Sequence, residues 1–169
     1  MSRIKKNYND LIAFVLVIFS IIGNSILSEF NFFFDINHFF NLQYLLIYFF
    51  SFNRFKYLTL STLFILGLVN DSLVGISLGI SSVAYMLIYK IALYQHNIKL
   101  RSIFISEWFA CGLSILVAYA FVLSIFFFEQ VNFDYFQYFY NFLGSFITYP
   151  LLWVILKYTF LKIEKFENE

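Results

Sequence analysis

The chain has 169 residues, of which 62% are apolar, 24% are aromatic and only 12% are charged, and its net charge is +1. A water-soluble domain usually carries about 25% charged residues, because it must cover its surface with groups that water solvates well. The composition therefore excludes an ordinary water-soluble globule and indicates that the chain folds in lipid.

Six apolar stretches follow one another along the chain, and each is a candidate for a transmembrane helix, which needs about 20 mostly apolar residues. In chain order they cover residues 10–27, 36–52, 57–71, 76–95, 103–128 and 136–160. The third stretch is short, and no segment between the stretches is long enough for a separate soluble domain. We therefore expect one all-α domain over residues 1–169, with six transmembrane helices.

The basic residues give an independent test of this order, since Lys and Arg accumulate in short cytoplasmic loops. With the N-terminus in the cytoplasm and six alternating crossings, all 11 basic residues fall at the cytoplasmic side: Arg3, Lys5, Lys6, Arg54, Lys56, Lys90, Lys99, Arg101, Lys157, Lys162 and Lys165. The three outer loops, near residues 28–35, 71–76 and 129–135, contain none of them and carry acidic residues instead. We therefore expect a multi-pass protein with both termini in the cytoplasm.

Residues 66–86 differ from the rest because they concentrate glycines around a polar pair, Asn70 and Asp71. Gly75 and Gly79 have the four-residue spacing of small side chains that lets membrane helices approach closely. This spacing predicts a smooth face on the fourth helix for packing against another helix.

Asp71 allows two interpretations, because a carboxylate close to the membrane is costly unless it lies at the interface or has hydrogen-bond donors. In the first, it caps the start of the fourth helix across a short turn. In the second, Asp71 and Asn70 form a polar contact point for a partner or a ligand.

The spacing G-L-x-x-D-x-x-x-G-x-x-L-G, with Gly67, Leu68, Asp71, Gly75, Leu78 and Gly79, resembles the signature of the rod-shape-determining MreD family. The length of the chain, the layout of its six stretches and a short loop with Arg54 and Lys56 before the signature are also similar to that family.

The resemblance implies a multi-pass protein of the bacterial inner membrane whose fold is similar to the substrate-binding subunits of energy-coupling-factor transporters. It implies a non-enzymatic scaffold that links MreC and MreB to peptidoglycan synthesis in the cell-elongation machinery. The implied partners are MreC in the first place, MreB and the elongation peptidoglycan synthase in the same complex, and membrane lipids, with no nucleic acid. The candidate residues for partner binding or helix packing are Gly67, Asn70, Asp71, Gly75, Leu78 and Gly79.

The sequence gives no pattern typical of an enzyme. His38 and His96 are the only histidines, and the expected topology places them on opposite sides of the membrane, so they cannot share a metal ion. Neither a phosphate-binding glycine loop nor a nucleophile elbow is present. We expect no catalytic residues, no metal and no cofactor.

A solute-binding subunit of a vitamin transporter of the energy-coupling-factor type is the alternative. The expected topology places many polar side chains in the outer half of the membrane: Asn24, Asn31, Asn37, Asn41, Gln43, Asn70 and Asp71. Polar groups inside a membrane often line a substrate site. A transporter subunit predicts an enclosed outer cavity on which several amides converge, whereas a scaffold predicts filled packing and an exposed apolar helix face.

Overall fold

The computed structural model describes residues 2–29, 41–98, 104–130 and 135–166, and the side chains of 8–23, 41–98, 104–130 and 136–160. The described residues form six α-helices and no strand. The helices are α1 (Ser2–Glu29), α2 (Leu42–Phe52), α3 (Leu60–Val74), α4 (Ile80–Asn97), α5 (Phe104–Phe128) and α6 (Tyr135–Phe166). The expected all-α class is confirmed.

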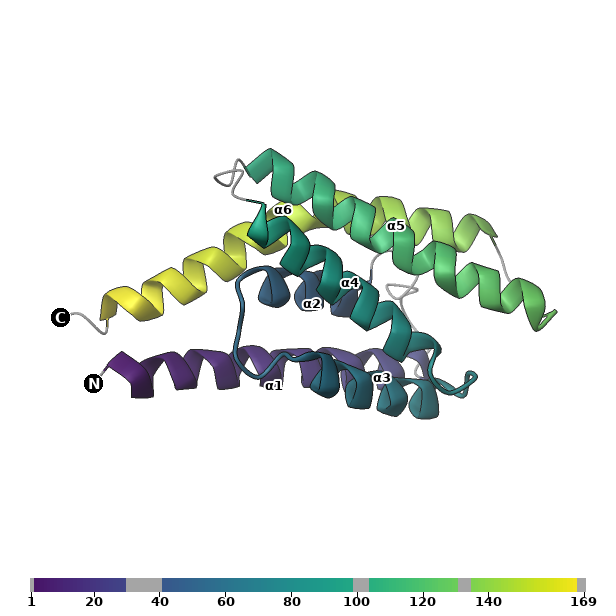
Figure 1. The fold of residues 1–169 in the computed structure, drawn as a ribbon, viewed down its shortest axis with the longest axis horizontal. Coiled ribbons are helices and arrows are strands. Elements are labelled where there is room, and N and C mark those ends of the chain that lie inside the picture. The colour runs from purple at the N-terminus through teal and green to yellow at the C-terminus, as the bar shows by residue number, and fades with distance from the viewer. Residues whose placement is uncertain (1, 30–40, 99–103, 131–134, 167–169) are drawn as a thin grey trace.

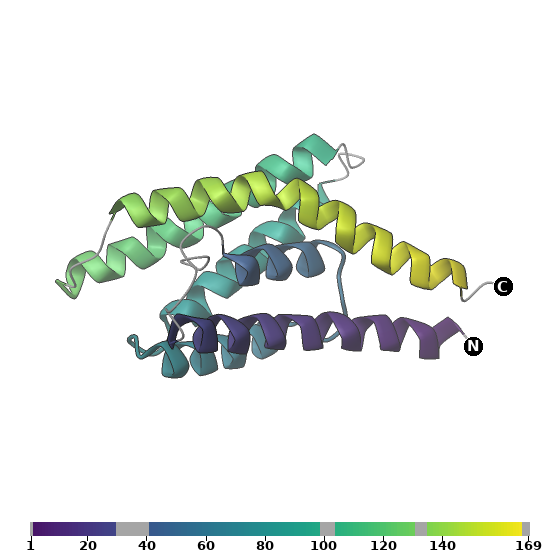
Figure 2. The same cartoon turned by 180° about the vertical axis from the view of Figure 1, so that it is seen from behind.

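Successive helices run in alternating directions, so the chain passes back and forth along one long axis (Figures 1 and 2). The first turn of α1 and the last turn of α6 lie at one end of the bundle, the turn between α3 and α4 lies toward the other, and the connection between α2 and α3 lies on the side of the termini but well inside that end (Figure 1). Arg54 in the α2–α3 connection donates a hydrogen bond through Nη2 to Asn97 Oδ1 at the end of α4. This contact joins two segments that the basic-residue pattern assigns to the same side of a membrane.

Two of the described helical segments are long and apolar enough to cross a membrane, Phe104–Phe128 and Phe136–Phe160. By contrast, α2 has only 11 residues, a length of about 17 Å at 1.5 Å per residue. Six crossings therefore stay a prediction, and the expected stretch 36–52 lies partly outside the described residues.

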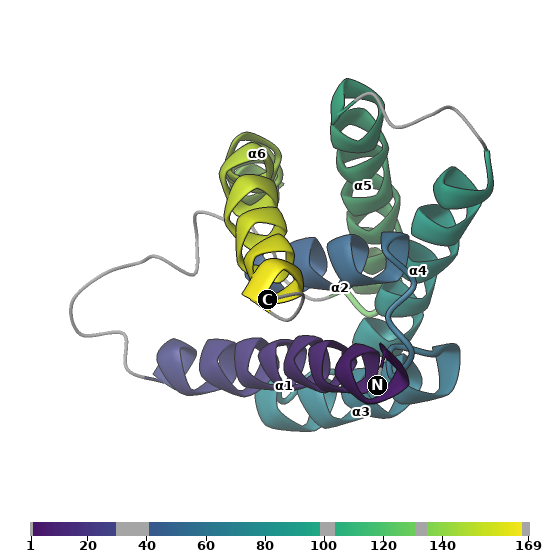
Figure 3. The same cartoon turned by 90° about the vertical axis from the view of Figure 1, so that its left-hand side faces the viewer.

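α2 is the central helix of the bundle. It is enclosed by α1 and α3 on one side and by α4, α5 and α6 on the others (Figure 3). All nine residues from Gln43 to Ser51 are buried. A helix that is apolar on every side has no face to present to water, so it lies either among other helices, as α2 does here, or against lipid. The surrounding helices keep many large apolar side chains exposed, among them Phe19, Ile65, Phe109 and Ile147.

The helix starts follow from local side-chain caps. Asn41 precedes α2, and its side chain accepts a hydrogen bond from the Tyr44 N–H. Thr59 precedes α3 and forms a reciprocal capping box with Thr62, in which each side chain accepts from the other residue's N–H. Such caps satisfy N–H groups that have no partner within the first turn of a helix.

α6 contains Pro150, the only proline of the chain, and bends near its middle (Figure 2). Proline has no N–H, so the carbonyl four residues earlier, that of Phe146, loses its helical donor. The Trp108 indole N–H of α5 donates to this carbonyl at 2.8 Å. The proline thus creates an acceptor that fastens α6 to α5.

Candidate functional site

The turn between α3 and α4 is built around the carboxylate of Asp71, which has no exposed surface. Its Oδ2 accepts from the Gly79 N–H at 2.7 Å and its Oδ1 accepts from the Ser81 N–H at 3.0 Å. Gly79 is the N-cap residue of α4 and makes no side-chain cap of its own. Asp71 therefore supplies the acceptor that the first turn of α4 lacks. This geometry is that of a cap, the first of the two interpretations of this residue.

The backbone carbonyl of Asp71 also takes part in the turn. It accepts from the N–H groups of Gly75 at 2.9 Å and Ile76 at 3.2 Å, which closes the end of α3. Four hydrogen bonds thus converge on one residue. Because both carboxylate oxygens are occupied and buried, Asp71 acts in the turn by joining the two helices.

Gly75 and Gly79 do not form the packing face on α4 that their spacing predicts. α4 begins at Ile80, and both glycines lie in the turn, Gly75 with φ +74° and Gly79 with φ +103°. A Cβ added to either would meet no atom within 4 Å. These positions favour glycine because L-residues with a side chain are strained at positive φ, and close helix approach is not the reason.

Gly67 is the glycine that permits close helix packing. A Cβ at this position would lie 2.3 Å from the Ser82 Cα, so the backbones of α3 and α4 touch there. The Ser82 hydroxyl donates to the Phe64 carbonyl at 3.0 Å in the same region. The close approach that the glycine spacing indicated is thus present, but at Gly67 and within the α3–α4 pair.

Asn70 and Leu78 differ in exposure. Asn70 is 5% exposed, and its Nδ2 donates to the Ser81 Oγ at 2.9 Å. Leu78 is 70% exposed at the tip of the turn. Of the six candidate residues, the structure joins Gly67, Asn70, Asp71, Gly75 and Gly79 in one helical hairpin and leaves the side chain of Leu78 outside it.

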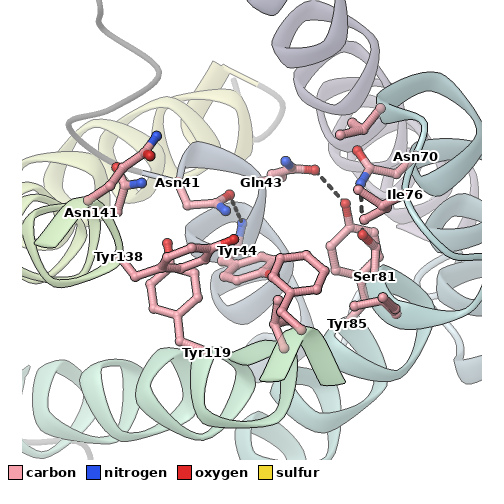
Figure 4. Close-up of a pocket in the computed structure, with 15 residues that line it drawn as sticks. Asn41, Gln43, Tyr44, Asn70, Ile76, Ser81, Tyr85, Tyr119, Tyr138 and Asn141 are labelled. Carbon is pink, nitrogen blue, oxygen red and sulfur yellow. Dashed lines mark hydrogen bonds between the residues drawn. The ribbon is translucent and has the colours of Figure 1, made fainter. Parts of the chain in front are cut away.

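A polar cavity of about 290 Å³ lies beside this turn (Figure 4). Its described lining residues come from five helices, α2 to α6, and from the segments just before α2 and α4. Five amide side chains line it: Asn41, Gln43, Asn70, Gln137 and Asn141. Among the described residues that line the cavity, none is an acid, a histidine or a basic residue.

Four tyrosines from four helices form a row along the cavity. Tyr44 of α2 packs edge-to-face on Tyr85 of α4, with ring centroids 5.9 Å apart. On its other side Tyr44 meets Tyr119 of α5 at 5.5 Å, and Tyr119 meets Tyr138 of α6 at 5.6 Å. The Tyr85 hydroxyl donates to Gln43 Oε1. Figure 4 shows this row with the amides around it.

Two amide oxygens of the cavity, Asn70 Oδ1 and Asn141 Oδ1, are buried and accept no hydrogen bond from the part of the chain that the structure describes. Asn70 holds its orientation through the bond from Nδ2 to Ser81. Buried polar atoms nearly always have a partner, because an unpartnered one loses its bonds to water without replacement. Two residues of the cavity wall therefore carry a buried amide oxygen that no described residue satisfies.

The sequence identified part of this cavity. Asn41, Gln43 and Asn70 line it, whereas Asp71 does not; the side chain of Asn24 is outside the described ones, as are Asn31 and Asn37. Gln137 and Asn141, in the first two turns of α6, were not predicted as cavity residues. Both follow the expected outer loop at 129–135, which was a signal that they lie at the same end of the bundle as Asn41. The four tyrosines of the cavity were not predicted, because no single tyrosine stands out in a chain in which 24% of the residues are aromatic.

No three side chains among the His, Cys, Asp and Glu residues that the structure describes come close enough to hold a metal ion. The buried Glu107 of α5 accepts from the Trp153 Nε1 at 2.9 Å, which ties α5 to α6. Lys157 lies over the Trp153 ring, 4.1 Å from its centroid. These contacts are those of helix packing.

A scan against protein-family models found no match for this chain, and neither did searches of the curated proteins and of the solved structures.

Proposed function

We propose that the chain is a non-enzymatic membrane scaffold of the bacterial cell-elongation machinery, similar to the MreD family. It crosses the inner membrane six times, with both termini in the cytoplasm, in a fold like that of the substrate-binding subunits of energy-coupling-factor transporters. It binds MreC and, through the complex, links MreB to the elongation peptidoglycan synthase.

The observation that carries the proposal is the common structural role of the signature residues. Gly67 permits the contact of α3 with α4, Asp71 caps α4, and Gly75 and Gly79 provide the positive φ angles of the turn. A spacing that meets several demands of one hairpin is more specific than the same glycines scattered over a helix. The alternating helix directions and the two long apolar segments agree with a multi-pass protein.

Leu78 is the signature residue that the hairpin does not use, which makes it the candidate contact for a partner. It is 70% exposed, and Leu73 and Val74 beside it are about half exposed. A partner helix or a periplasmic partner domain would cover this apolar tip. Exposed apolar side chains grouped at one place are typical of an interaction site.

The scaffold role is tested by depletion of the protein in its own cells, followed by microscopy and by co-purification with MreC. Depletion should turn rods into spheres. Leu78→Ser should reduce co-purification by about tenfold, the effect of about 1.4 kcal/mol. Leu151→Ser is the matched control, because Leu151 is 68% exposed on α6, away from the turn. Rods that keep their shape after depletion would refute the scaffold role, and equal loss in both variants would refute the contact.

A solute-binding subunit of an energy-coupling-factor type vitamin transporter is the second candidate function. The polar cavity favours it, since amides from several helices converge there. Depletion should then create a nutrient requirement and abolish uptake of that nutrient while cell shape is kept. Uptake that continues at the normal rate after depletion would count against this function alone.

A further inference from the structure

We infer that the cavity binds a small uncharged ring compound that carries amide or hydroxyl groups. This inference deepens the second candidate function, since it names the class of solute, and it does not depend on the scaffold role. Three properties of the cavity lead to this ligand: the absence of charge among its described lining residues, the unpartnered amide oxygens in its wall and the row of aromatic rings.

The described part of the cavity wall favours an uncharged ligand. No described lining residue is charged, and the neighbouring acid, Asp71, already accepts two backbone N–H groups with its carboxylate. A charged ligand would lose its hydration in this place without meeting a counter-charge, which is a large cost. An amide or hydroxyl group, in contrast, finds neutral partners of the same kind.

The free acceptors set where the ligand carries its donors. Asn70 Oδ1 comes from α3, with the residue 95% buried, and Asn141 Oδ1 comes from α6. Figure 4 shows the two amides on opposite sides of the cavity. A ligand with an N–H or O–H group at each of two ends satisfies both oxygens at once, so the pair favours a ligand that spans the cavity.

The tyrosine row sets the shape of the ligand. Tyr44, Tyr119 and Tyr138 line the cavity between the two amides, and a planar or ring-shaped ligand gains dispersion energy and aromatic contacts against such rings. A volume of about 290 Å³ is at the lower end for ligand pockets, and therefore suits a single ring with substituents.

Binding is measured on the full chain in lipid nanodiscs by isothermal titration with two pairs of probes. Nicotinamide and nicotinate share one heteroaromatic ring, and only nicotinate is charged. N-acetylglucosamine and glucosamine share one sugar ring, and only glucosamine is charged at pH 7. At least one neutral probe should bind, and its charged counterpart should bind at least tenfold more weakly; the pair that responds distinguishes an aromatic ligand from a saccharide.

Variants then place the binding in the cavity. Asn141→Leu and, independently, Tyr138→Leu, which removes a ring of the tyrosine row, should each weaken the neutral probe about tenfold. Gln95→Leu should leave binding unchanged, because Gln95 bonds to Ser106 at the opposite end of the bundle. Thermal unfolding of each variant shows that it is folded, and Tyr138→Leu keeps the test valid should Asn141→Leu unfold.

Three results would overturn the inference. One is the absence of binding of both neutral probes at about 10 mM, a concentration that reveals even millimolar affinity. The second is equal affinity for the charged and the neutral member of a pair. The third is unchanged binding in both folded cavity variants. Loss of uptake in depleted cells is a separate measurement, so binding without any uptake would refute transport and keep the site.

Discussion

The α3–α4 turn and the polar cavity share one end of the bundle, yet their buried polar atoms are treated in opposite ways. In the turn, both oxygens of Asp71 accept backbone N–H groups. In the cavity, one amide oxygen of the adjacent residue, Asn70, has no partner among the described residues. Because an unpartnered buried acceptor is costly, the first arrangement stabilises the fold, whereas the second is the one from which we infer a ligand. Two residues that are neighbours in sequence thus differ in whether the described part of the chain satisfies their oxygens.

The largest expected effect is that of Asp71→Ala, which removes the acceptor of two N–H groups at the start of α4. Hydrogen bonds to a carboxylate contribute about 1.5–3 kcal/mol each, so we expect the free energy of unfolding to fall by about 3 kcal/mol. Unfolding in mixed micelles measures it. Asp71→Asn keeps one acceptor oxygen and should lose about half as much. An Ala variant as stable as the parent would show that the turn does not depend on this cap.

The next effect is that of Gly67→Ala, whose new Cβ would lie 2.3 Å from the Ser82 Cα and push α3 away from α4. Overpacking of this kind costs about 2 kcal/mol. Gly23→Ala is the matched control, because Gly23 is also helical and a Cβ there meets nothing within 4 Å. The control should be as stable as the parent or slightly more stable, by helix propensity. Equal behaviour of the two variants would contradict the close contact.

Gly75→Ala should cost about 1–2 kcal/mol, because alanine is strained at φ +74°. Gly75→Asn should cost less, since asparagine adopts left-handed conformations more readily than other residues with a side chain. The comparison of their melting temperatures separates backbone strain from helix packing. Equal loss in both variants, despite the open space at this position, would point to another role of the glycine.

A smaller effect is expected at the Phe146 carbonyl, a second acceptor that has a hydrogen-bond donor in the fold. Trp108→Phe should cost about 1 kcal/mol, because it removes the indole N–H that donates to this carbonyl from α5. In a Pro150→Ala background the helix regains its own N–H donor at position 150, so the same substitution should cost less. A double-mutant cycle measures this coupling. Additive losses would mean that the proline and the tryptophan act independently.

The smallest expected effect belongs to the cavity. Asn141→Leu should change the free energy of unfolding by less than about 0.5 kcal/mol, because the lost oxygen has no partner to leave behind. The chemical denaturation curve of the folded variant should overlay that of the parent. A loss as large as that of Asp71→Ala would show that the cavity amides stabilise the fold, and the contrast between the two regions would disappear.

The presence of the helices could be predicted, because a long run of apolar residues is itself a local signal for a helix in a membrane. The expected stretch 103–128 and α5 differ by one residue at the start, and the stretch 136–160 lies within α6. The position of α2 at the centre could not be predicted, since burial by other helices and exposure to lipid both demand apolar side chains. The same ambiguity concealed that Gly75 and Gly79 bend the chain, because their four-residue spacing is also that of a helix face.

Asp71 shows how far the candidate site could be derived. A lone acid before a glycine pair indicates a cap, and the structure gives it two N–H donors. The cavity, in contrast, joins residues as far apart as Asn41 and Asn141, which depends on how five helices pack. No pattern within one stretch of sequence predicts that these distant residues line the same cavity. The amides of α2 and α3 were identified by their polarity, and those of α6 needed the fold.

The bend at Pro150 has a mechanical consequence. The half of α6 before the proline carries Gln137, Tyr138 and Asn141 into the cavity wall, and the half after it carries Trp153 and Lys157 toward the other end. The Trp108–Phe146 bond holds the first half at the hinge. The angle at the proline therefore fixes how the cavity-lining half of α6 is inclined to the half that Trp153 ties to α5.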